Sequence, residues 1–238
     1  MKDIRVVILA GGRGVRLRPY TTVFPKPLMP IGEMPILEVV LRQLKSFGFE
    51  KITLSVSHLA DLIKTFFGNG SKLGLDISYC IEDEPLGTAG SLSLVDNLTD
   101  PFLVMNGDLL TTIDYSVIVN KHINSDAVAT IGVFPREVEI DFGVLELGQN
   151  GELLEYKEKP RFEYLVSMGV NVFNKSVLEY ISRAQYLDMP ALMMKLKNDG
   201  KTVLTYQSKC EWLDIGRPDD YKEAVAAFEQ ARDKYLRR

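Results

Sequence analysis

A segment rich in glycine and arginine is the part of the sequence best suited to bind a negatively charged ligand. Its glycines permit positive φ angles and let a ligand approach backbone N–H groups, while its arginines supply positive charge. The preceding residues 5–9 are almost all apolar and predict a strand buried on both faces. Ligands bind at the carboxyl ends of such strands in α/β sheets, so the position favours a binding loop. The segment reads Leu9-Ala10-Gly11-Gly12-Arg13-Gly14-Val15-Arg16-Leu17.

The spacing of this loop differs from two common phosphate-binding patterns. Leu17 stands where the dinucleotide fingerprint G-x-G-x-x-G needs its third glycine, and no Gly-Lys-Ser/Thr follows to complete a P-loop. A further cation, Lys26, lies between two prolines that stiffen its backbone. The alternative is a glycine turn with solvated basic residues, which the position after the first strand makes less favourable.

Two aspartates follow later apolar runs. Asp108 ends the string Asn106-Gly107-Asp108 after residues 102–105, and Asp214 lies in Trp212-Leu213-Asp214-Ile215-Gly216. Mg²⁺ is commonly held by one or two carboxylates together with phosphate oxygens, so a shared magnesium site is one interpretation. By spacing alone, each aspartate also fits a helix N-cap or a turn.

The elements that must position these residues alternate in the first half of the chain. Apolar runs predict strands, and helical spacing of apolar residues predicts the segments between them, so we expect a mainly parallel sheet with helices on both faces. The second half predicts a small antiparallel extension, with a hairpin around Asn150-Gly151. The predicted strands are residues 5–9, 51–56, 75–81, 102–105, 127–134, 143–147, 153–156 and 170–173, and the predicted helices are residues 35–47, 59–67, 88–94, 176–181, 190–197 and 219–236.

Composition narrows the classes of function. The chain has 238 residues and a net charge of −4, which does not suit binding to nucleic-acid backbones. Two cysteines and two histidines are too few for a zinc site or a disulfide scaffold. No run of about 20 apolar residues or signal peptide is present, so we expect a cytoplasmic protein with no membrane partner. No linker or repeat divides the chain, which favours one mixed α/β domain.

The motifs taken together resemble the sugar-1-phosphate nucleotidylyltransferases, also called NDP-sugar pyrophosphorylases. They occur in the order of that family and span almost the whole chain. The resemblance implies a Rossmann-like mixed sheet and a reaction of NTP with sugar 1-phosphate that gives NDP-sugar and pyrophosphate. The matching strings are residues 10–17, Pro25-Lys26-Pro27-Leu28, Leu86-Gly87-Thr88-Ala89-Gly90, Asn106-Gly107-Asp108, Glu158-Lys159-Pro160 and residues 212–216.

The resemblance also implies roles for individual residues. Arg16, Lys26 and Asp108 would be catalytic, and Asp108 and Asp214 would ligate Mg²⁺. Residues 1–115 would form a nucleotide-binding half and residues 116–238 a sugar-phosphate-binding half. The nucleotide would contact Leu9, Ala10, Gly11, Gly12, Arg13, Gly14, Glu82, Pro85, Gly87 and Thr88, and the sugar phosphate would contact Gly143, Glu158, Lys159 and Gly169.

Several points are left open by the resemblance. Many members carry Asn two residues before the glycine of the sugar-binding strand, whereas this chain reads Ser167-Met168-Gly169, so the sugar is not identified. Glu82 lies where uridylyl- and thymidylyltransferases often have glutamine, and a carboxylate suits the adjacent N–H donors of guanine. We therefore expect GTP, with mannose- or manno-heptose-1-phosphate guanylyltransferases as the most similar members. The alternatives are a thymidylyl-, uridylyl- or cytidylyltransferase, or a non-catalytic homologue that senses sugar nucleotides. We expect a stand-alone enzyme without an appended module, and homo-oligomerisation is left open.

Overall fold

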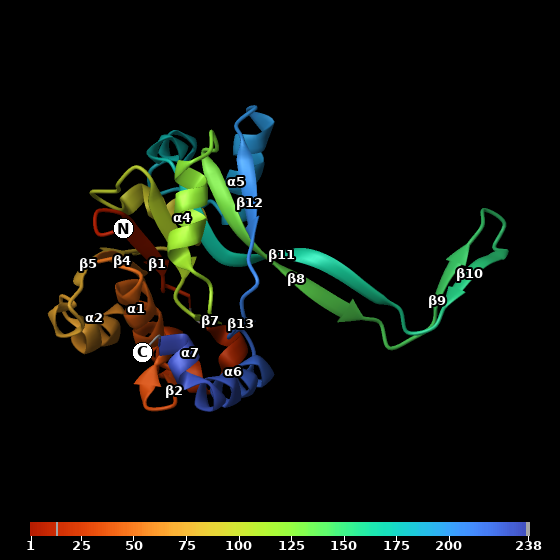
Figure 1. The fold of residues 1–238 in the computed structure, drawn as a ribbon, viewed down its shortest axis with the longest axis horizontal. Coiled ribbons are helices and arrows are strands. Elements are labelled where there is room, and N and C mark those ends of the chain that lie inside the picture. Colours follow the sequence, from red (N-terminus) through yellow and green to blue (C-terminus); the bar gives the residue numbers. More distant parts are fainter. Residues whose placement is uncertain (13, 237–238) are drawn as a thin grey trace.

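A mixed seven-stranded sheet forms the centre of the computed structural model, which describes residues 1–12 and 14–236 (Figure 1). The strand order is β12-β8-β11-β6-β1-β4-β5. Strands β1, β4, β5 and β6 pair in parallel, β11 runs antiparallel to both β6 and β8, and β12 runs parallel to β8. The predicted Rossmann-like, mainly parallel sheet is confirmed. Its strands are β1 (Arg5–Leu9), β4 (Lys51–Val56), β5 (Asp76–Ile81), β6 (Phe102–Asn106), β8 (Ala129–Glu139), β11 (Arg161–Phe173) and β12 (Val203–Gln207).

The core lies on both faces of this sheet because its central strands are apolar throughout. In β1, Val6 and Ile8 belong to one buried cluster and Val7 to another, and all three are 0% exposed. The first cluster includes side chains of α1 (Ile36–Ser46), α2 (Ala60–Phe67) and α4 (Tyr115–Ile123). The second includes side chains of α3 (Gly87–Gly90) and α5 (Met189–Asn198). The sheet is therefore covered by helices on both faces, as predicted.

Short 3₁₀ segments connect several of these elements. Residues 88–94, predicted as one short helix, form α3 followed by η5, and the helix predicted at residues 176–181 is η6. Helix α4 was not predicted, because its apolar residues are interrupted by Ser116, Asn120 and Lys121. The 3₁₀ segments are η1 (Val15–Leu17), η2 (Tyr20–Thr22), η3 (Lys26–Leu28), η4 (Ser71–Leu73), η5 (Ser91–Leu94) and η6 (Lys175–Tyr180).

Two short antiparallel pairs and the C-terminal helices pack beside the main sheet. β7 (Leu109–Thr111) pairs with β13 (Trp212–Asp214), and β2 (Pro30–Ile31) pairs with β3 (Met34–Pro35). The helix predicted over residues 219–236 is two helices, α6 (Pro218–Gln230) and α7 (Arg232–Leu236). Their break at Ala231 lets Phe228 and Tyr235 pack in one cluster, with ring centroids 6.0 Å apart. The buried cluster between these elements is separate from the two on the sheet.

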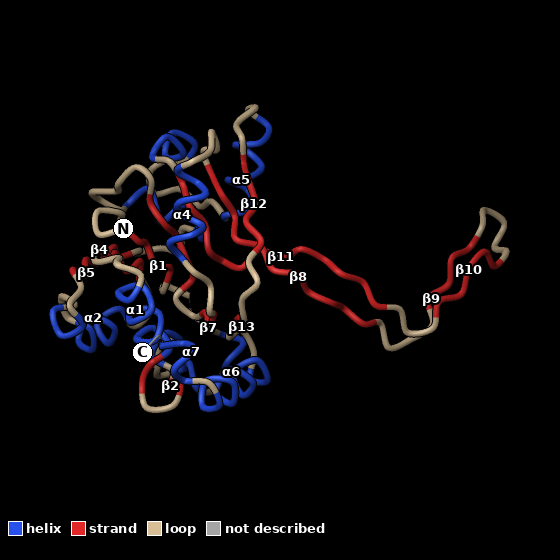
Figure 2. Tube along the Cα trace, in the orientation of Figure 1, coloured by secondary structure: helices blue, strands red, loops and turns tan. Residues whose placement is uncertain are grey.

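A long hairpin projects from the body of the molecule (Figures 1 and 2). Strands β8 and β11 continue well past the predicted residues 127–134 and 170–173, and their pairing extends to Glu139 opposite Arg161. The antiparallel pair β9 (Val144–Leu147) and β10 (Leu153–Lys157) lies at the far end, around the predicted turn at Asn150-Gly151. We call residues 136–165 the arm. No helix in the described part of the chain has the length and apolar character needed to cross a bilayer.

Candidate functional site

The glycine loop after β1 is held in a conformation that excludes larger residues. Gly14 has φ +58°, and a Cβ there would lie 2.9 Å from Cγ2 of Thr21. The Thr21 hydroxyl donates a hydrogen bond of 2.7 Å to the Gly14 carbonyl, and the Ser57 hydroxyl donates one of 2.9 Å to the Gly11 carbonyl. The loop is thus fixed from two sides, which leaves its backbone pre-organised for a ligand. Arg13, predicted to bind nucleotide, lies outside the described residues.

Lys26 and Asp108 form an ion pair at the carboxyl edge of the sheet. Lys26 begins η3 and is buried, and its Nζ contacts Oδ2 of Asp108. Asp108 follows β6, and the adjacent Gly107 N–H donates to the carbonyl of Leu9, at 3.0 Å. The ends of β1 and β6 are therefore joined, so the aspartate lies directly beside the glycine loop.

Asp214 reaches the same place through strand pairing. In the β7–β13 pair Asp214 lies opposite Leu109, and the Ile215 N–H donates to the carbonyl of Asp108 at 3.2 Å. Burial, then the nearby charge of Asp108, raises the pKa of the Asp214 carboxyl, while Lys26 and Arg16 act in the opposite direction. Lys26, Asp108 and Asp214 thus lie close together, although Lys26 is 82 residues before Asp108 in the sequence.

Arg16 completes this cluster from η1. A Cβ added at Gly216 would lie 3.4 Å from both Nη1 of Arg16 and Oδ2 of Asp214, so guanidinium and carboxylate flank the same glycine. Arg16 is exposed and so is free to contact a ligand from solvent. The structure therefore brings together the three residues predicted to be catalytic and the second predicted metal ligand.

The pair of carboxylates fits a magnesium ion better than a closed metal cage. No group of three or more His, Cys, Asp or Glu side chains suited to a metal is found among residues 1–12 and 14–236. Mg²⁺ retains several waters and takes phosphate oxygens as ligands, so it needs only one or two protein carboxylates. A divalent cation would also offset the repulsion that raises the Asp214 pKa.

Glu82 lies beside the glycine loop at the end of β5. A Cβ at Gly11 would be 3.3 Å from Oε1 of Glu82, which shows how close the two are. Its Oε1 accepts a hydrogen bond of 2.8 Å from the Ser55 hydroxyl, and Oε2 accepts one of 3.2 Å from the Leu86 N–H. The carboxylate is therefore oriented by the chain. Ser55 and Ser57 were not singled out from the sequence, although their place at the end of the second predicted strand was a usable signal.

Gly87 and Thr88, also predicted to bind nucleotide, have contacts that serve the fold. Gly87 has φ +74°, and a Cβ there would lie 2.7 Å from the carbonyl oxygen of Leu187. The Thr88 hydroxyl accepts a hydrogen bond of 2.8 Å from the N–H of Met189, the first residue of α5. Pro85 lies exposed in the preceding loop. This segment thus joins the region around Glu82 to α5.

The residues predicted to bind sugar phosphate fall in two places. Gly169 has φ +71°, and a Cβ there would lie 2.5 Å from Nδ2 of Asn106, two residues before Asp108. Gly143, Glu158 and Lys159 lie on the arm, away from the cluster (Figure 1). There Oε2 of Glu158 accepts a hydrogen bond of 3.3 Å from the Tyr156 hydroxyl. The structure does not bring these three together with the catalytic cluster.

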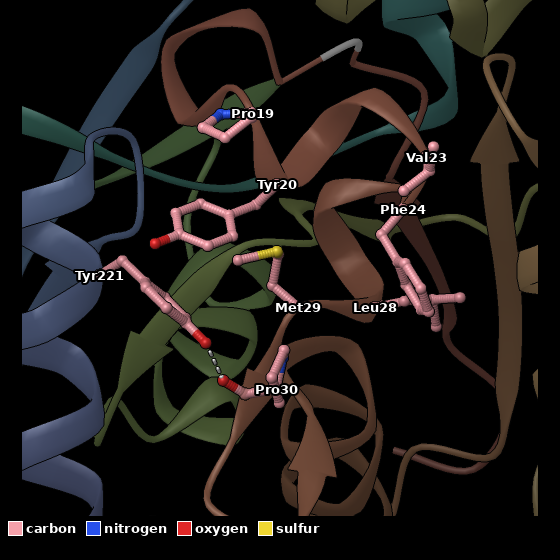
Figure 3. A pocket seen from close by; sticks show the side chains of 8 residues that line it. All are labelled: Pro19, Tyr20, Val23, Phe24, Leu28, Met29, Pro30 and Tyr221. Atoms are coloured by element: carbon pink, nitrogen blue, oxygen red, sulfur yellow. Dashed lines mark hydrogen bonds between the residues drawn. The ribbon is translucent and has the colours of Figure 1, made fainter.

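An apolar pocket of about 640 Å³ lies next to the same loop (Figure 3). Tyr20 and Tyr221 lie on one side of it and Phe24 on the other, and the Tyr221 hydroxyl donates to the carbonyl of Pro30 at 2.6 Å. The pocket is formed mainly by residues 19–30, the stretch that links Arg16 to Lys26 and continues beyond it. Its lining is Pro19, Tyr20, Val23, Phe24, Leu28, Met29, Pro30 and Tyr221.

Comparison with known proteins identifies relatives of this chain. The chain is 34% identical to a UTP–glucose-1-phosphate uridylyltransferase of Synechocystis sp., over 93% of this chain and 62% of that protein. It is 30% identical to a D-glycero-α-D-manno-heptose 1-phosphate guanylyltransferase of Aneurinibacillus thermoaerophilus, over 93% of this chain and 96% of that protein. This chain thus spans less than two thirds of the first relative and nearly all of the second.

Solved structures and a family profile extend the comparison. HddC from Yersinia pseudotuberculosis superposes with a TM-score of 0.73 at 25% identity, covering 94% of this chain and 99% of that one. Its structure complexed with GMP-PN gives a TM-score of 0.70 at 26% identity, with the same coverage. The profile of the family described as nucleotidyl transferase matches residues 5–231. The glycine loop, both aspartates and the arm all lie within that match, and the chain belongs to the nucleotidyl transferase family.

Proposed function

We propose that this protein transfers a nucleoside monophosphate from an NTP to a sugar 1-phosphate, releasing pyrophosphate. The observation that carries the proposal is the convergence of Arg16, Lys26, Asp108 and Asp214 beside the glycine loop. Two cations, two carboxylates and a glycine loop form a site for several phosphate groups and a divalent cation. The names of both curated relatives describe nucleotidyl transfer to a sugar 1-phosphate.

The residues of the site suit a reaction between two anions. An oxygen of the sugar phosphate attacks the α-phosphorus of the NTP, and the bond from that phosphorus to the bridging oxygen of pyrophosphate breaks. The nucleophile is already an anion and needs no general base, so the task is alignment and charge neutralisation. Lys26 would lie against the reacting phosphates and Arg16 against the triphosphate. Mg²⁺, held by Asp108 and Asp214, would supply further positive charge to the phosphate oxygens.

We further propose that GTP is the preferred nucleotide. Guanine presents N1–H and N2–H₂ side by side, and the Glu82 carboxylate, which only accepts hydrogen bonds, can receive both. Ser55 and the Leu86 N–H fix its orientation next to Gly11, and each carboxylate oxygen retains further acceptor capacity. A uracil or thymine base would place a carbonyl oxygen against this carboxylate. The GMP-PN complex of the Yersinia protein agrees with a guanine nucleotide.

The test is a matrix of four NTPs against a panel of sugar 1-phosphates, with pyrophosphate release as the readout. We expect kcat/KM for GTP to exceed that for UTP and dTTP at least roughly tenfold, the value of a paired hydrogen bond in a desolvated pocket. The variant Glu82→Gln should narrow that ratio, whereas Glu84→Gln, in the same acidic run, should leave it unchanged. Preference for UTP would favour the uridylyl alternative suggested by the Synechocystis relative. If no combination of NTP and sugar 1-phosphate were turned over, the result would favour the alternative of a non-catalytic homologue that binds sugar nucleotides.

A second experiment separates the two substrates. Arg16→Ala should raise KM for the NTP far more than KM for the sugar 1-phosphate, because Arg16 extends from the glycine loop. Lys159→Ala should do the reverse if the arm supplies the cation for the sugar phosphate. Lys26→Ala should mainly lower kcat, since its charge is needed most as the two anions approach each other. An unchanged sugar KM in Lys159→Ala would contradict the role given to the arm.

A further inference from the structure

The arm places Lys159 too far out to act on the site of its own chain. β11 leaves the body near Ser167, and Arg161, two residues after Lys159, lies six residues further along the strand. At 3.3 Å per residue this separates Arg161 from the body by roughly 20 Å. A lysine side chain does not span that distance, so the site of a single copy lacks the cation expected at its sugar end.

The arm is held straight by pairing between its own two strands. Its strands stay paired without a break from Ser167 opposite Val133 to Arg161 opposite Glu139. Arg161 also forms ion pairs with Glu137 and Glu139 across the ladder. Within residues 1–12 and 14–236, all side-chain hydrogen bonds and ion pairs of residues 136–165 join residues of that range. A bend within residues 161–167 would break this ladder.

The arm also carries apolar side chains that have no covering layer. A two-stranded hairpin alone is at best marginally stable in water, so this one is expected to pack against something. Side chains of this size, about half exposed, offer on the order of 1,000 Å² together, close to the ~800 Å² that each partner contributes to a stable interface. They are Val138, Ile140, Phe142, Leu145, Leu147, Leu153, Leu154, Tyr156, Tyr164 and Leu165.

The body of the same chain offers a complementary surface. Beside the cluster, residues 15–24 expose Tyr20, Val23 and Phe24, at 57%, 69% and 53%, around the apolar pocket of Figure 3. Residues 10–32 contain four basic residues and no acidic one, whereas the arm contains eight acidic and four basic residues. Both segments carry exposed apolar side chains, and their sequences have opposite net charges, +4 and −4. Arg16 and Arg18 are the exposed cations among the described residues of the first segment, because Lys26 is buried against Asp108.

We propose that two copies of this chain exchange arms, each arm packing on residues 15–30 of the other copy. Glu158 and Lys159 of one copy then complete the sugar-phosphate end of the other copy's site. The role given to Lys159 rests on the proposed nucleotidyl transfer. The site of each copy is completed only in the dimer, and neither copy is active alone.

A heterodimer of two impaired variants tests the exchange when it is assayed at a sugar 1-phosphate concentration well below the raised KM of Lys159→Ala. Asp108→Asn has an intact arm and a defective body, and Lys159→Ala has the reverse. The two are co-expressed with different tags and purified through both tags, so that only mixed dimers remain. With exchanged arms, one of the two sites has an intact body and an intact arm, and we expect about half the wild-type turnover. Activity no higher than that of the two parent variants would overturn the exchange, because each arm would then serve its own body.

Sedimentation measures the association independently of any activity. The wild type should sediment as a dimer of 26.8 kDa chains. Phe142→Ser and Leu154→Ser on the arm should give monomers with an unchanged circular dichroism spectrum. Leu62→Ser, which removes a 42% exposed leucine from α2, is the matched control and should remain dimeric. A monomeric wild type would overturn the proposal even if it turned over substrate. If no turnover were found with any substrate pair, the nucleotidyl transfer would fail while a dimer dissolved only by the arm variants would still support the exchange.

Discussion

Replacing Lys26 should destabilise the protein, whereas replacing Asp108 should not, although both changes should strongly lower turnover. Three charged groups of the cluster are shielded from solvent: Lys26 is buried, and Asp108 and Asp214 are half-buried. Arg16 is exposed, so water already screens its charge. The shielded groups therefore carry one excess negative charge. Replacing Asp108 lowers this excess and replacing Lys26 raises it, so the two changes should affect the stability differently.

The expected magnitudes follow from this imbalance. Lys26→Met leaves two carboxylates facing each other, and removing one partner of a buried pair costs about 3–5 kcal/mol. The side chains here are 10% and 20% exposed, so we expect about 2–3 kcal/mol, or roughly 5–10 °C in Tm for a chain of this size. Asp108→Asn leaves Lys26 with Asp214 alone and removes repulsion between carboxylates. The free energy of unfolding should then change by less than about 1 kcal/mol.

The assay is urea unfolding in EDTA, paired with pyrophosphate release in Mg²⁺. Lys26→Arg is the control that keeps the charge and should retain most of the stability. Turnover should fall by about 10²–10³ in Asp108→Asn, the usual loss when a main charge-stabilising group is removed. Because both aspartates would serve one ion, the double variant with Asp214→Asn should be little worse than either single change. Equal destabilisation by Lys26→Met and Asp108→Asn would refute the charge imbalance.

Three further predictions concern the scaffold. Gly169→Ala should lower the free energy of unfolding by more than Gly151→Ala, measured by urea titration, because both glycines have positive φ but only Gly169 has an atom within 2.5 Å of the new Cβ. Burial lowers the pKa of His122, so stability present above pH 6.5 should be lost as the pH falls through the folded pKa. His122→Gln should reduce the slope of stability against pH, followed by unfolding between pH 5 and 8. Thr88→Val should cost about 1 kcal/mol through the lost bond to the start of α5, with little change in KM for the NTP; a large KM change with unaltered stability would instead indicate direct contact with the nucleotide.

Local patterns in the sequence determined most of the sheet and the glycine loop. β1, β4 and the helix that became α1 lie within one or two residues of their predicted bounds, because an apolar run or a helical period is a property of neighbouring residues. The same holds for the turn at Asn150-Gly151, whose backbone preferences are local. The end of the predicted strand at residues 102–105 also placed Asp108 at the carboxyl edge of the sheet, whereas the position of Lys26 followed only from the family resemblance.

Strand pairing between distant segments decided the position of Asp214 and the course of the arm. Asp214 joins Asp108 through the pairing of β13 with β7, and β7, three residues long, gave too short a pattern to detect. The arm is a stronger case, because its strands alternate in composition like any half-buried strand. Only the register between β8 and β11 extends them beyond the body and carries Glu158 and Lys159 away from their own site. The alternation of apolar and polar residues in a strand is a property of its own sequence, whereas its partner strand and its length depend on contacts with segments distant in the chain.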